Sequence, residues 1–338
     1  MTLANRLAQA TATLALMAGI SASASLAEPA LIFDLGGKFD KSFNEAAYNG
    51  AERWKAETGG SYQEFEMREE TQREQSLRRL AENGANPVVT TGFGMSDPIT
   101  RVAPDFPDTK FVTIDGWVDP ALHPNVLSIA FREEEGSYLT GMLAAQASKT
   151  GTVGFVGGMD IPLIRAFACG FAQGAKAVNP DIKFVSSMTG DTPDAWNDPV
   201  KGSEQARALK AQGADVIFAA AGQTGLGVLQ AAADEGILSV GVDSNQNYLH
   251  PGQVLTSMLK RVDVAVYNSF TQGENLDLTP QVLGLKEDGV GYALDDNNAA
   301  LITPEMKASV DAAAAKIIAG ELKVHDYRAD NTCPAAEF

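Results

Sequence analysis

The chain of 338 residues holds only two cysteines and three histidines. The histidines are isolated near prolines or chain turns, which favours loop positions over catalysis; they are His123, His250 and His325. No Cys or His grouping has the spacing of metal ligands, so we expect neither a metal site nor a bound cofactor. Cys169 and Cys333 lie far apart in the sequence, and their spacing leaves a disulfide open.

Basic residues are scarce relative to acidic ones. The chain has 26 Lys and Arg against 43 Asp and Glu, a formal net charge of −17. Such a chain repels nucleic acid and anionic membranes, so we expect no nucleic-acid partner, and the charge can serve solubility alone. The phosphate-cradling Gly-x-x-x-x-Gly-Lys-Ser/Thr pattern is also missing, which disfavours a phosphate ligand.

The first residues have the pattern of an export signal. Arg6 supplies a positive charge, residues 7–20 are apolar, and Ser25-Leu26-Ala27 forms a small-x-small cleavage site. The apolar stretch is short for a membrane span, although an uncleaved anchor is the alternative. We expect residues 1–27 to be a cleaved signal peptide and the mature chain to be periplasmic rather than an integral membrane protein. The residue directly after the cleavage site is Glu28 and not a cysteine, so we expect no lipid anchor on the first mature residue.

Apolar strands alternate with amphipathic helices along the rest of the chain. We predict strands at residues 30–33, 87–91, 111–114, 126–131, 152–156, 182–186, 216–219 and 238–242. Continuous apolar strands between such helices favour a parallel sheet that is covered on both faces. A mature chain of about 310 residues favours two domains. The expected fold class is α/β, with two Rossmann-like lobes and a hinged cleft between them.

The alternation comes in two blocks, and each block closes with a strand followed by an acid, Asp115 in the first and Asp243 in the second. This symmetry predicts two similar lobes, joined by a hinge, in which the carboxyl ends of the strands face each other. We expect the strand at 254–259 and the helix at 262–272 to return to the first lobe, and the segments at 282–285 and 304–319 to belong to the second. The expected lobes are residues 28–131 with 258–280, and residues 132–257 with 281–338.

The segment after the first strand is the most informative. Asp34 stands at the strand end, a glycine pair follows, and Ser42-Phe43-Asn44 leads into a helix. Ligands of open α/β sheets sit beyond the carboxyl ends of the strands. This segment therefore places a carboxylate, an aromatic ring and the backbone amides of a helix start at one edge of the sheet. Such a combination suits a small, flat, polar ligand.

A set of motifs resembles the basic membrane protein family, whose characterised members include purine-nucleoside-binding receptors of ABC transporters. The motifs run in order along nearly the whole mature chain: Asp34-Leu35-Gly36-Gly37, Asp40-Lys41-Ser42-Phe43-Asn44, Gly92-Phe93, Phe111-Val112-Thr113-Ile114-Asp115-Gly116, Val153-Gly154-Phe155-Val156-Gly157-Gly158, Gly241-Val242-Asp243-Ser244-Asn245-Gln246 and Thr256-Ser257-Met258-Leu259-Lys260. The resemblance implies a type I periplasmic binding protein that closes on a purine nucleoside, delivers it to an ABC permease and catalyses no reaction. Many relatives are lipoproteins, and this chain lacks their lipid-bearing cysteine.

The base side of the implied site centres on two aromatic residues. The resemblance gives Phe43 the role of stacking on the purine, and we expect Trp196 to cover the other face. The alternatives are that Phe43 staples the helix start and that Trp196 is a core residue between the lobes. Asp34 can accept hydrogen bonds from a base or cap the glycine turn. Asn44, next to Ser42 and Phe43, can read a base edge or cap the helix.

The sugar side is assigned by the same resemblance to Asp243 and Lys260. A carboxylate can accept both hydroxyls of a ribose diol, and an ammonium can donate to the same oxygens; the alternative is a salt bridge between the lobes that ignores the ligand. Asp115 is a further candidate, or a turn cap.

Several other residues could either line the pocket or stabilise the fold. We expect the backbone to approach the ligand at Gly222. Phe93 and Met159 can wall the pocket or pack in the core. Asp40 is more consistent with a cap. The run Glu133-Glu134-Glu135 fits the first turn of a helix.

Three other functions remain open from the residues. An exported nucleoside hydrolase would need an acid or a metal at the leaving base, and Asp34 could serve as that acid. A binding protein of the same frame could take another flat heteroaromatic ligand, such as a flavin. A sugar-responsive repressor core shares the architecture, but the export signal, the acidic charge and the missing N-terminal helix-turn-helix disfavour it.

Overall fold

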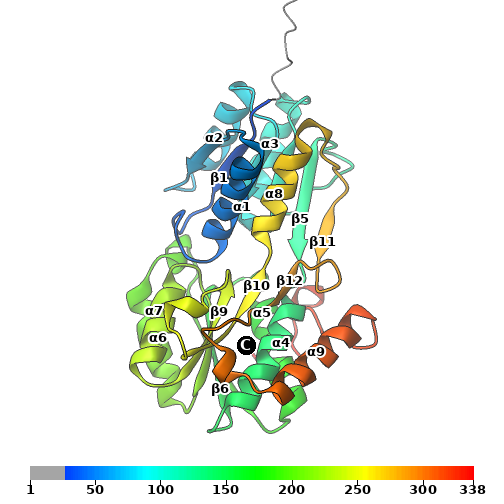
Figure 1. The fold of residues 1–338 in the computed structure, drawn as a ribbon. Coiled ribbons are helices and arrows are strands. Elements are labelled where there is room, and N and C mark those ends of the chain that lie inside the picture. The colour runs from blue at the N-terminus through cyan, green and yellow to red at the C-terminus, as the bar shows by residue number, and fades with distance from the viewer. Residues whose placement is uncertain (1–26) are drawn as a thin grey trace, which may run out of the picture.

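The computed structural model describes residues 27–338, so the predicted signal peptide lies outside the described residues, apart from Ala27. Within residues 27–338 the strands form two sheets of six, and each sheet builds one lobe with helices on both faces (Figure 1). None of the helices in this range combines the length and apolar character needed to cross a membrane. The predicted α/β fold with two lobes is confirmed.

The first lobe is built on an all-parallel sheet. Its strand order is β2 (Gln63–Glu66), β1 (Ala30–Phe33), β3 (Val88–Thr91), β4 (Phe111–Ile114), β5 (Val126–Phe131) and β11 (Gln281–Leu283). The helices of this lobe are α1 (Phe43–Thr58), α2 (Gln72–Glu82), α3 (Ser96–Val102) and α8 (Val262–Gln272). The central strands are buried along their whole length, which explains their unbroken apolar sequence.

The second lobe repeats the strand order of the first. Its sheet runs β7 (Lys183–Gly190), β6 (Thr152–Met159), β8 (Val216–Ala220), β9 (Leu238–Asp243), β10 (Val254–Lys260) and β12 (Val290–Tyr292). The edge strand β12 pairs antiparallel with β10, and the other pairs are parallel. Its helices are α4 (Glu133–Ala147), α5 (Pro162–Val178), α6 (Pro199–Ala211), α7 (Thr224–Asp234) and α9 (Pro304–Ile318). The repeat makes β4 and β9 equivalent strands.

Two predicted lobe assignments are wrong. Strand β10 pairs with β9 in the second sheet, and β11 pairs with β5 in the first, so residues 258–260 and 281–283 each lie in the lobe opposite to the predicted one. The pairing of β11 with the distant β5 depends on tertiary contacts, which a local pattern does not record. Strand β10 pairs with β9, the strand directly before it in the chain, and its apolar sequence fits either sheet. The edge strands β2 and β12 were not predicted, because a short strand such as Gln63–Glu66 carries few apolar residues.

Helix α8 does return to the first lobe, as predicted. It packs on α1 so closely that a Cβ added to Gly50 would lie 2.1 Å from the carbonyl oxygen of Asp263. Helices α4 and α5 of the second lobe approach in the same way, since a Cβ on Gly174 would lie 1.9 Å from the carbonyl oxygen of Tyr138. Glycine lets these backbones come close, and α4 is thereby fixed on α5.

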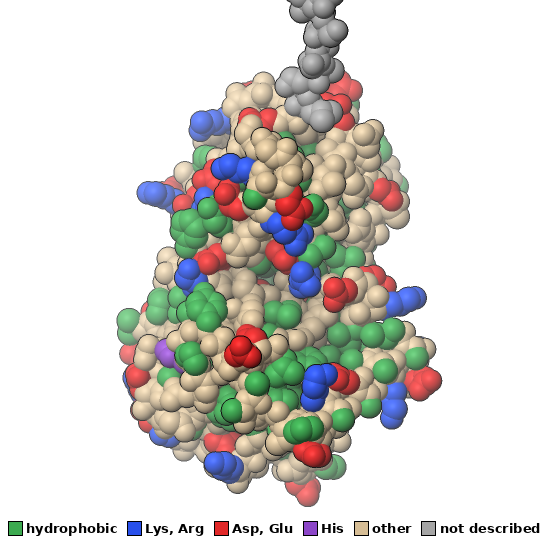
Figure 2. Space-filling view, in the orientation of Figure 1, with side chains coloured by type: hydrophobic (Ala, Val, Ile, Leu, Met, Phe, Trp, Pro, Cys, Tyr) green, Lys and Arg blue, Asp and Glu red, His purple; other side chains and the backbone are tan. Residues whose placement is uncertain are grey.

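The chain passes between the lobes three times within residues 27–338: from β5 to α4, from β10 to α8, and from β11 to β12. These passages form the hinge side of the cleft. Basic and acidic side chains are interspersed over both lobes on the face shown in Figure 2. Cys169 and Cys333, whose pairing the sequence left open, form a disulfide between α5 and the C-terminal segment.

Candidate ligand-binding site

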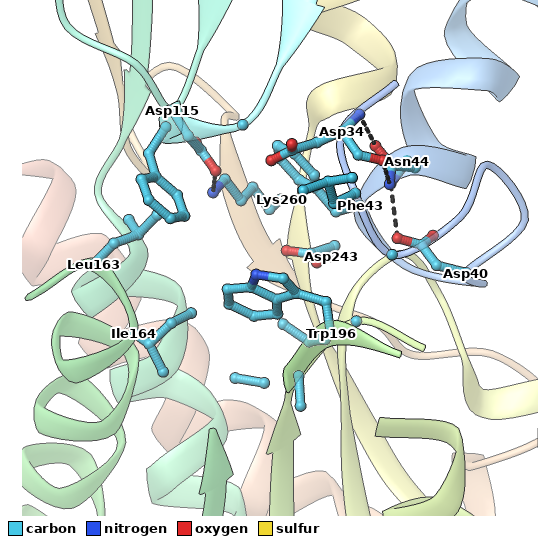
Figure 3. Close-up of a pocket in the computed structure, with 18 of the residues that line it drawn as sticks. Asp34, Asp40, Phe43, Asn44, Asp115, Leu163, Ile164, Trp196, Asp243 and Lys260 are labelled. Atoms are coloured by element: carbon cyan, nitrogen blue, oxygen red, sulfur yellow. Dashed lines mark hydrogen bonds and ion pairs between the residues drawn. The ribbon is translucent and has the colours of Figure 1, made fainter. Parts of the chain in front are cut away.

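A pocket lies between the lobes, at the carboxyl ends of strands from both sheets (Figure 3). Its empty volume is about 620 Å³, part of it open to solvent, and small-molecule sites typically span about 300–1,000 Å³. The lining includes most of the predicted site residues: Asp34, Phe43, Asn44, Phe93, Asp115, Trp196, Gly222, Asp243 and Lys260. The sequence pattern therefore predicted residues that the fold brings together.

Two predicted site residues lie off the pocket wall. Ser42 is fully buried behind the wall, and its hydroxyl donates to Asp243. Met159 ends β6, where it pairs with Gly190 of β7, and it is not among the residues that line the pocket. The proposal that Met159 walls the pocket is therefore not supported by its position.

Phe43 and Trp196 flank the pocket from opposite lobes (Figure 3). Trp196 ends the 3₁₀ turn Pro193–Trp196, and its indole lies against the backbone of β6. A Cβ on Gly158 would come within 2.1 Å of its Cζ3, so glycine at this position makes room for the indole ring. Gly222 lies against the same side chain, with φ of +56°. Gly158 and Gly222 therefore determine how closely the indole of Trp196 can pack against the second lobe.

Two polar residues, Asp40 and Asn44, stabilise the loop between β1 and α1. The sequence alone did not decide whether each of them binds ligand or caps the helix. Asp40 accepts from the backbone N–H groups of Ser42, Asn44 and Glu45, so the cap prediction is confirmed. The Asn44 amide donates to the carbonyl oxygens of Asp34 and Gly37 and accepts from the Asp34 N–H. Both hydrogens of that amide are thus used within the loop, which places Asn44 as a support for the Asp34 backbone.

Asp34 presents a free acceptor to the pocket. Within residues 27–338, no group donates a hydrogen bond to its buried Oδ1, and the Arg73 guanidinium is 3.8 Å away. Burial raises the pKa of Asp34 to about 6, against the lowering effects of the Leu35 N–H and of Arg73. The carboxyl is therefore mainly ionised at neutral pH and can accept from a ligand N–H.

Asp243 and Asp115 occupy equivalent positions in the two lobes. Both stand at the carboxyl end of a strand in a left-handed conformation, with φ of +62° and +68°. Asp243 accepts from the Ser42 hydroxyl at 2.6 Å, and burial raises its pKa despite the nearby Lys260 and this hydrogen bond. Burial also raises the pKa of Asp115 to about 6, with Lys260 opposing the shift. The symmetry predicted from the sequence thus places two carboxylates in one pocket.

Lys260 joins these acids at the end of β10. Its Nζ lies 2.6 Å from Asp115 Oδ2 and 2.9 Å from Glu133 Oε1, and the Phe43 ring centroid is 5.2 Å away. Burial alone would lower the pKa of Lys260, but the carboxylates of Asp115, Glu133 and Asp243 hold it above its ordinary value. The side chain therefore stays a buried ammonium that faces both lobes.

Sequence reasoning missed part of the site. The first two turns of α5 add the apolar wall residues Leu163, Ile164 and Phe167, and an apolar helix start soon after strand β6 was an available signal. Glu133 does lie in the first turn of α4 as predicted, but it is fully buried against Lys260. A run of three acids gives no sign of which member is buried.

Known proteins resemble the chain over most of its length. Residues 28–327 match the model of a family described as Bmp, ABC transporter substrate-binding protein PnrA-like. The chain is 35% identical to basic membrane protein D of Borreliella burgdorferi over 275 residues, 76% of each chain. It is also 35% identical over 279 residues to an uncharacterised lipoprotein of Pyrococcus abyssi, which covers 78% of this chain and 68% of the relative. A crystal structure of an ABC transporter solute-binding protein from Aeropyrum pernix K1 has a similar fold, with a TM-score of 0.79 at 28% identity over 89% of this chain and 93% of that one.

Proposed function

Because the chain belongs to the Bmp family of PnrA-like ABC transporter substrate-binding proteins, we propose that its interlobe pocket binds a purine nucleoside. The bound form delivers the nucleoside to an ABC permease, and the predicted cleaved export signal places this step in the periplasm. The motif resemblance supplies the ligand class, and the pocket geometry supports it.

One observation carries the proposal. Two buried carboxylate oxygens on the pocket wall, Asp34 Oδ1 and Asp115 Oδ1, receive no hydrogen bond from any group in residues 27–338. A buried acceptor without a partner costs about 1–3 kcal/mol, so these oxygens favour a ligand that brings donors. A purine nucleoside has N–H donors on its base and O–H donors on its ribose.

The remaining pocket groups suit the shape of such a ligand. Phe43 and Trp196 offer aromatic faces from opposite lobes, and stacking of a base on an aromatic side chain contributes about 1–3 kcal/mol. Asp243 and Lys260 line the same pocket, and we expect them to hold the ribose diol through charge-assisted hydrogen bonds. Closure of the lobes then replaces water around the ligand with these contacts.

A thermal-shift panel tests the ligand class. Purine nucleosides, free purine bases, flavins and pentoses are compared at equal concentrations, because a ligand that binds only the folded state raises Tm by mass action. We expect the largest rise with inosine, guanosine or adenosine. A rise with a flavin alone, or no rise with any purine nucleoside, contradicts the proposal. Incubation with inosine separates binding from hydrolysis, since a hydrolase would release free hypoxanthine.

A further inference from the structure

The C-terminal segment, residues 320–338, is fastened to helix α5. The disulfide joins Cys333 of this segment to Cys169 on α5. Gln173, one turn further along α5, accepts from the His325 N–H at 2.9 Å and donates to the His325 carbonyl oxygen at 2.9 Å. This C-terminal segment is therefore held at two places on the helix that also walls the pocket.

Arg328 lies between these two attachments and reaches the first turn of α4. Its Nη1 is 2.8 Å from Glu133 Oε2, and its Nη2 is 3.2 Å from Glu134 Oε2. The same Nη2 donates to the carbonyl oxygen of Phe131 at 3.1 Å. Phe131 is the last residue of β5, where the chain passes from the first lobe to the second. Arg328 thus contacts both ends of one hinge passage.

Glu133 links Arg328 to the pocket. Its side chain is fully buried, and its second oxygen, Oε1, lies 2.9 Å from the Lys260 ammonium. Lys260 in turn pairs with Asp115 across the lobe boundary. A row of ion pairs therefore runs from the C-terminal segment through Arg328, Glu133 and Lys260 to the pocket wall.

Arg328 faces three carboxylates, because its Nε also donates to Asp326 Oδ1 at 2.9 Å, and it contributes the positive charge at this end of the row. The carboxylates of Asp115, Glu133 and Asp243 all act on the Lys260 ammonium. Removing one partner of a buried pair leaves the other charge uncompensated. Without Arg328, Glu133 would keep only the Lys260 ammonium as its buried partner, so we expect Lys260 to shift toward Glu133 and to favour the ionised form of the pocket carboxylates less.

We propose that Arg328, held in place by the Cys169–Cys333 disulfide, is a positioning residue that keeps Lys260 available to Asp115 and to the ligand. It shares the charge of Glu133 and braces the passage from β5 to α4. The ligand-affinity part of this proposal rests on the proposed nucleoside-binding function; the bracing of the hinge passage does not.

The first experiment replaces the charge of Arg328. Inosine affinity of Arg328→Met, Arg328→Lys and wild type is measured by calorimetry from pH 5 to 8. We expect Arg328→Met to bind inosine about tenfold more weakly at pH 7. As the pH is lowered, its affinity should begin to fall at a higher pH than that of wild type, because Asp115 and Asp243 protonate more easily. Arg328→Lys retains most of the affinity. Lys323→Met, which removes an exposed cation from the same segment, is the matched control and binds as wild type.

The second experiment tests whether the disulfide acts through Arg328. Replacing both cysteines by serine is expected to weaken inosine binding, but to cause no further loss in Arg328→Met. Loss of the same factor in both backgrounds contradicts this link, because independent effects add in free energy. Wild-type affinity and an unchanged pH profile in Arg328→Met contradict the positioning role itself.

Hydrogen exchange without ligand separates this inference from the proposed function. We expect faster exchange of amides in residues 131–138 of Arg328→Met than of Lys323→Met. If wild type binds no purine nucleoside, the proposed function fails, and this comparison still decides the bracing role. Equal exchange in the two variants overturns it.

Discussion

The hydroxyl of Ser42 donates to the carboxylate of Asp243 over 2.6 Å, and the two residues belong to different lobes. Two more bonds join the lobes beside it: Ser244 Oγ donates to the Ser42 carbonyl oxygen at 2.8 Å, and Gln246 Nε2 donates to that of Lys41 at 3.0 Å. Asp243 therefore serves the contact between the lobes as well as the pocket. Removal of its carboxylate therefore tests the sugar contact only when a nucleoside and its free base are compared, because loss of the lobe contact affects both ligands.

Asp243→Ala is expected to weaken nucleoside binding much more than binding of free purine bases. The carboxylate is proposed to hold the ribose, and a hydrogen bond to a charged group contributes about 1.5–3 kcal/mol, or roughly 10–150-fold in Kd. Calorimetric titration with inosine and with hypoxanthine measures the difference. The exposed Glu321→Ala is the control for loss of one acidic charge. Equal losses for nucleoside and base would refute the sugar role.

Gly158→Ala is expected to weaken the binding of nucleosides and of free bases to the same extent. The added Cβ would lie 2.1 Å from Trp196 Cζ3, so the indole must leave the position from which it faces Phe43, at a cost of about 1–3 kcal/mol of stacking. Gly291→Ala is the matched strand control, because a Cβ there meets no atom of the described residues within 4 Å. Unchanged affinity in Gly158→Ala would show that the indole does not stack on the ligand.

Lys260→Met is expected to destabilise the protein even without ligand. The substitution leaves Asp115 and Glu133 buried without this ammonium, and breaking a buried ion pair in this way costs about 3–5 kcal/mol. Urea denaturation measures the loss. Adding Asp115→Asn should restore part of the stability, because one of the uncompensated charges is then removed. A double variant less stable than Lys260→Met alone would contradict this account.

The free energy of unfolding is expected to fall as pH rises from about 5 to 8. Burial raises the pKa of Asp34 to about 6, that of Asp40 to about 7 and that of Glu134 to about 8, whereas an unfolded chain releases these protons near pH 4. The folded state thus binds more protons than the unfolded state in this window, and stability decreases with pH. Their contribution is fully present below pH 4 and is lost as pH rises through the raised values.

Thermal or urea unfolding of the ligand-free protein at several pH values checks this sign. Asp34→Asn should flatten the part of the profile near pH 6, since the amide does not titrate. A wild-type protein that becomes steadily more stable from pH 5 to 8 would show that burial does not raise the pKa values of these carboxyls.

Much of the candidate site could be predicted from local sequence patterns. Asp34 and Phe43 stand on either side of one strand-to-helix turn, and Asp115 and Asp243 each follow a buried strand, so the rule that ligands sit at strand ends was enough to group them. Both α/β lobes followed from the same alternation. The family resemblance added the proposed ligand class and the proposed sugar role of Asp243 and Lys260.

The parts that escaped prediction depend on contacts between distant segments. Lys260 and Glu133 meet because two separate hinge passages lie side by side, and Arg328 arrives from the C-terminal segment. Strands β10 and β11 were assigned to the wrong lobes, since an apolar run does not specify which sheet it joins. Met159 ends a strand as Asp243 does, but its side chain lies off the pocket wall.

The placement of β11 and α8 has a consequence for the order in which the two lobes can fold. The first sheet is completed by residues 281–283 and its helical cover by residues 262–272, so the second-lobe elements from α4 to β10 are synthesised before the first lobe can finish folding. A fragment that stops at residue 131 would leave the Gly50 side of α1 bare and the β5 edge unpaired. The first lobe therefore depends on chain that is synthesised only after most strands of the second lobe.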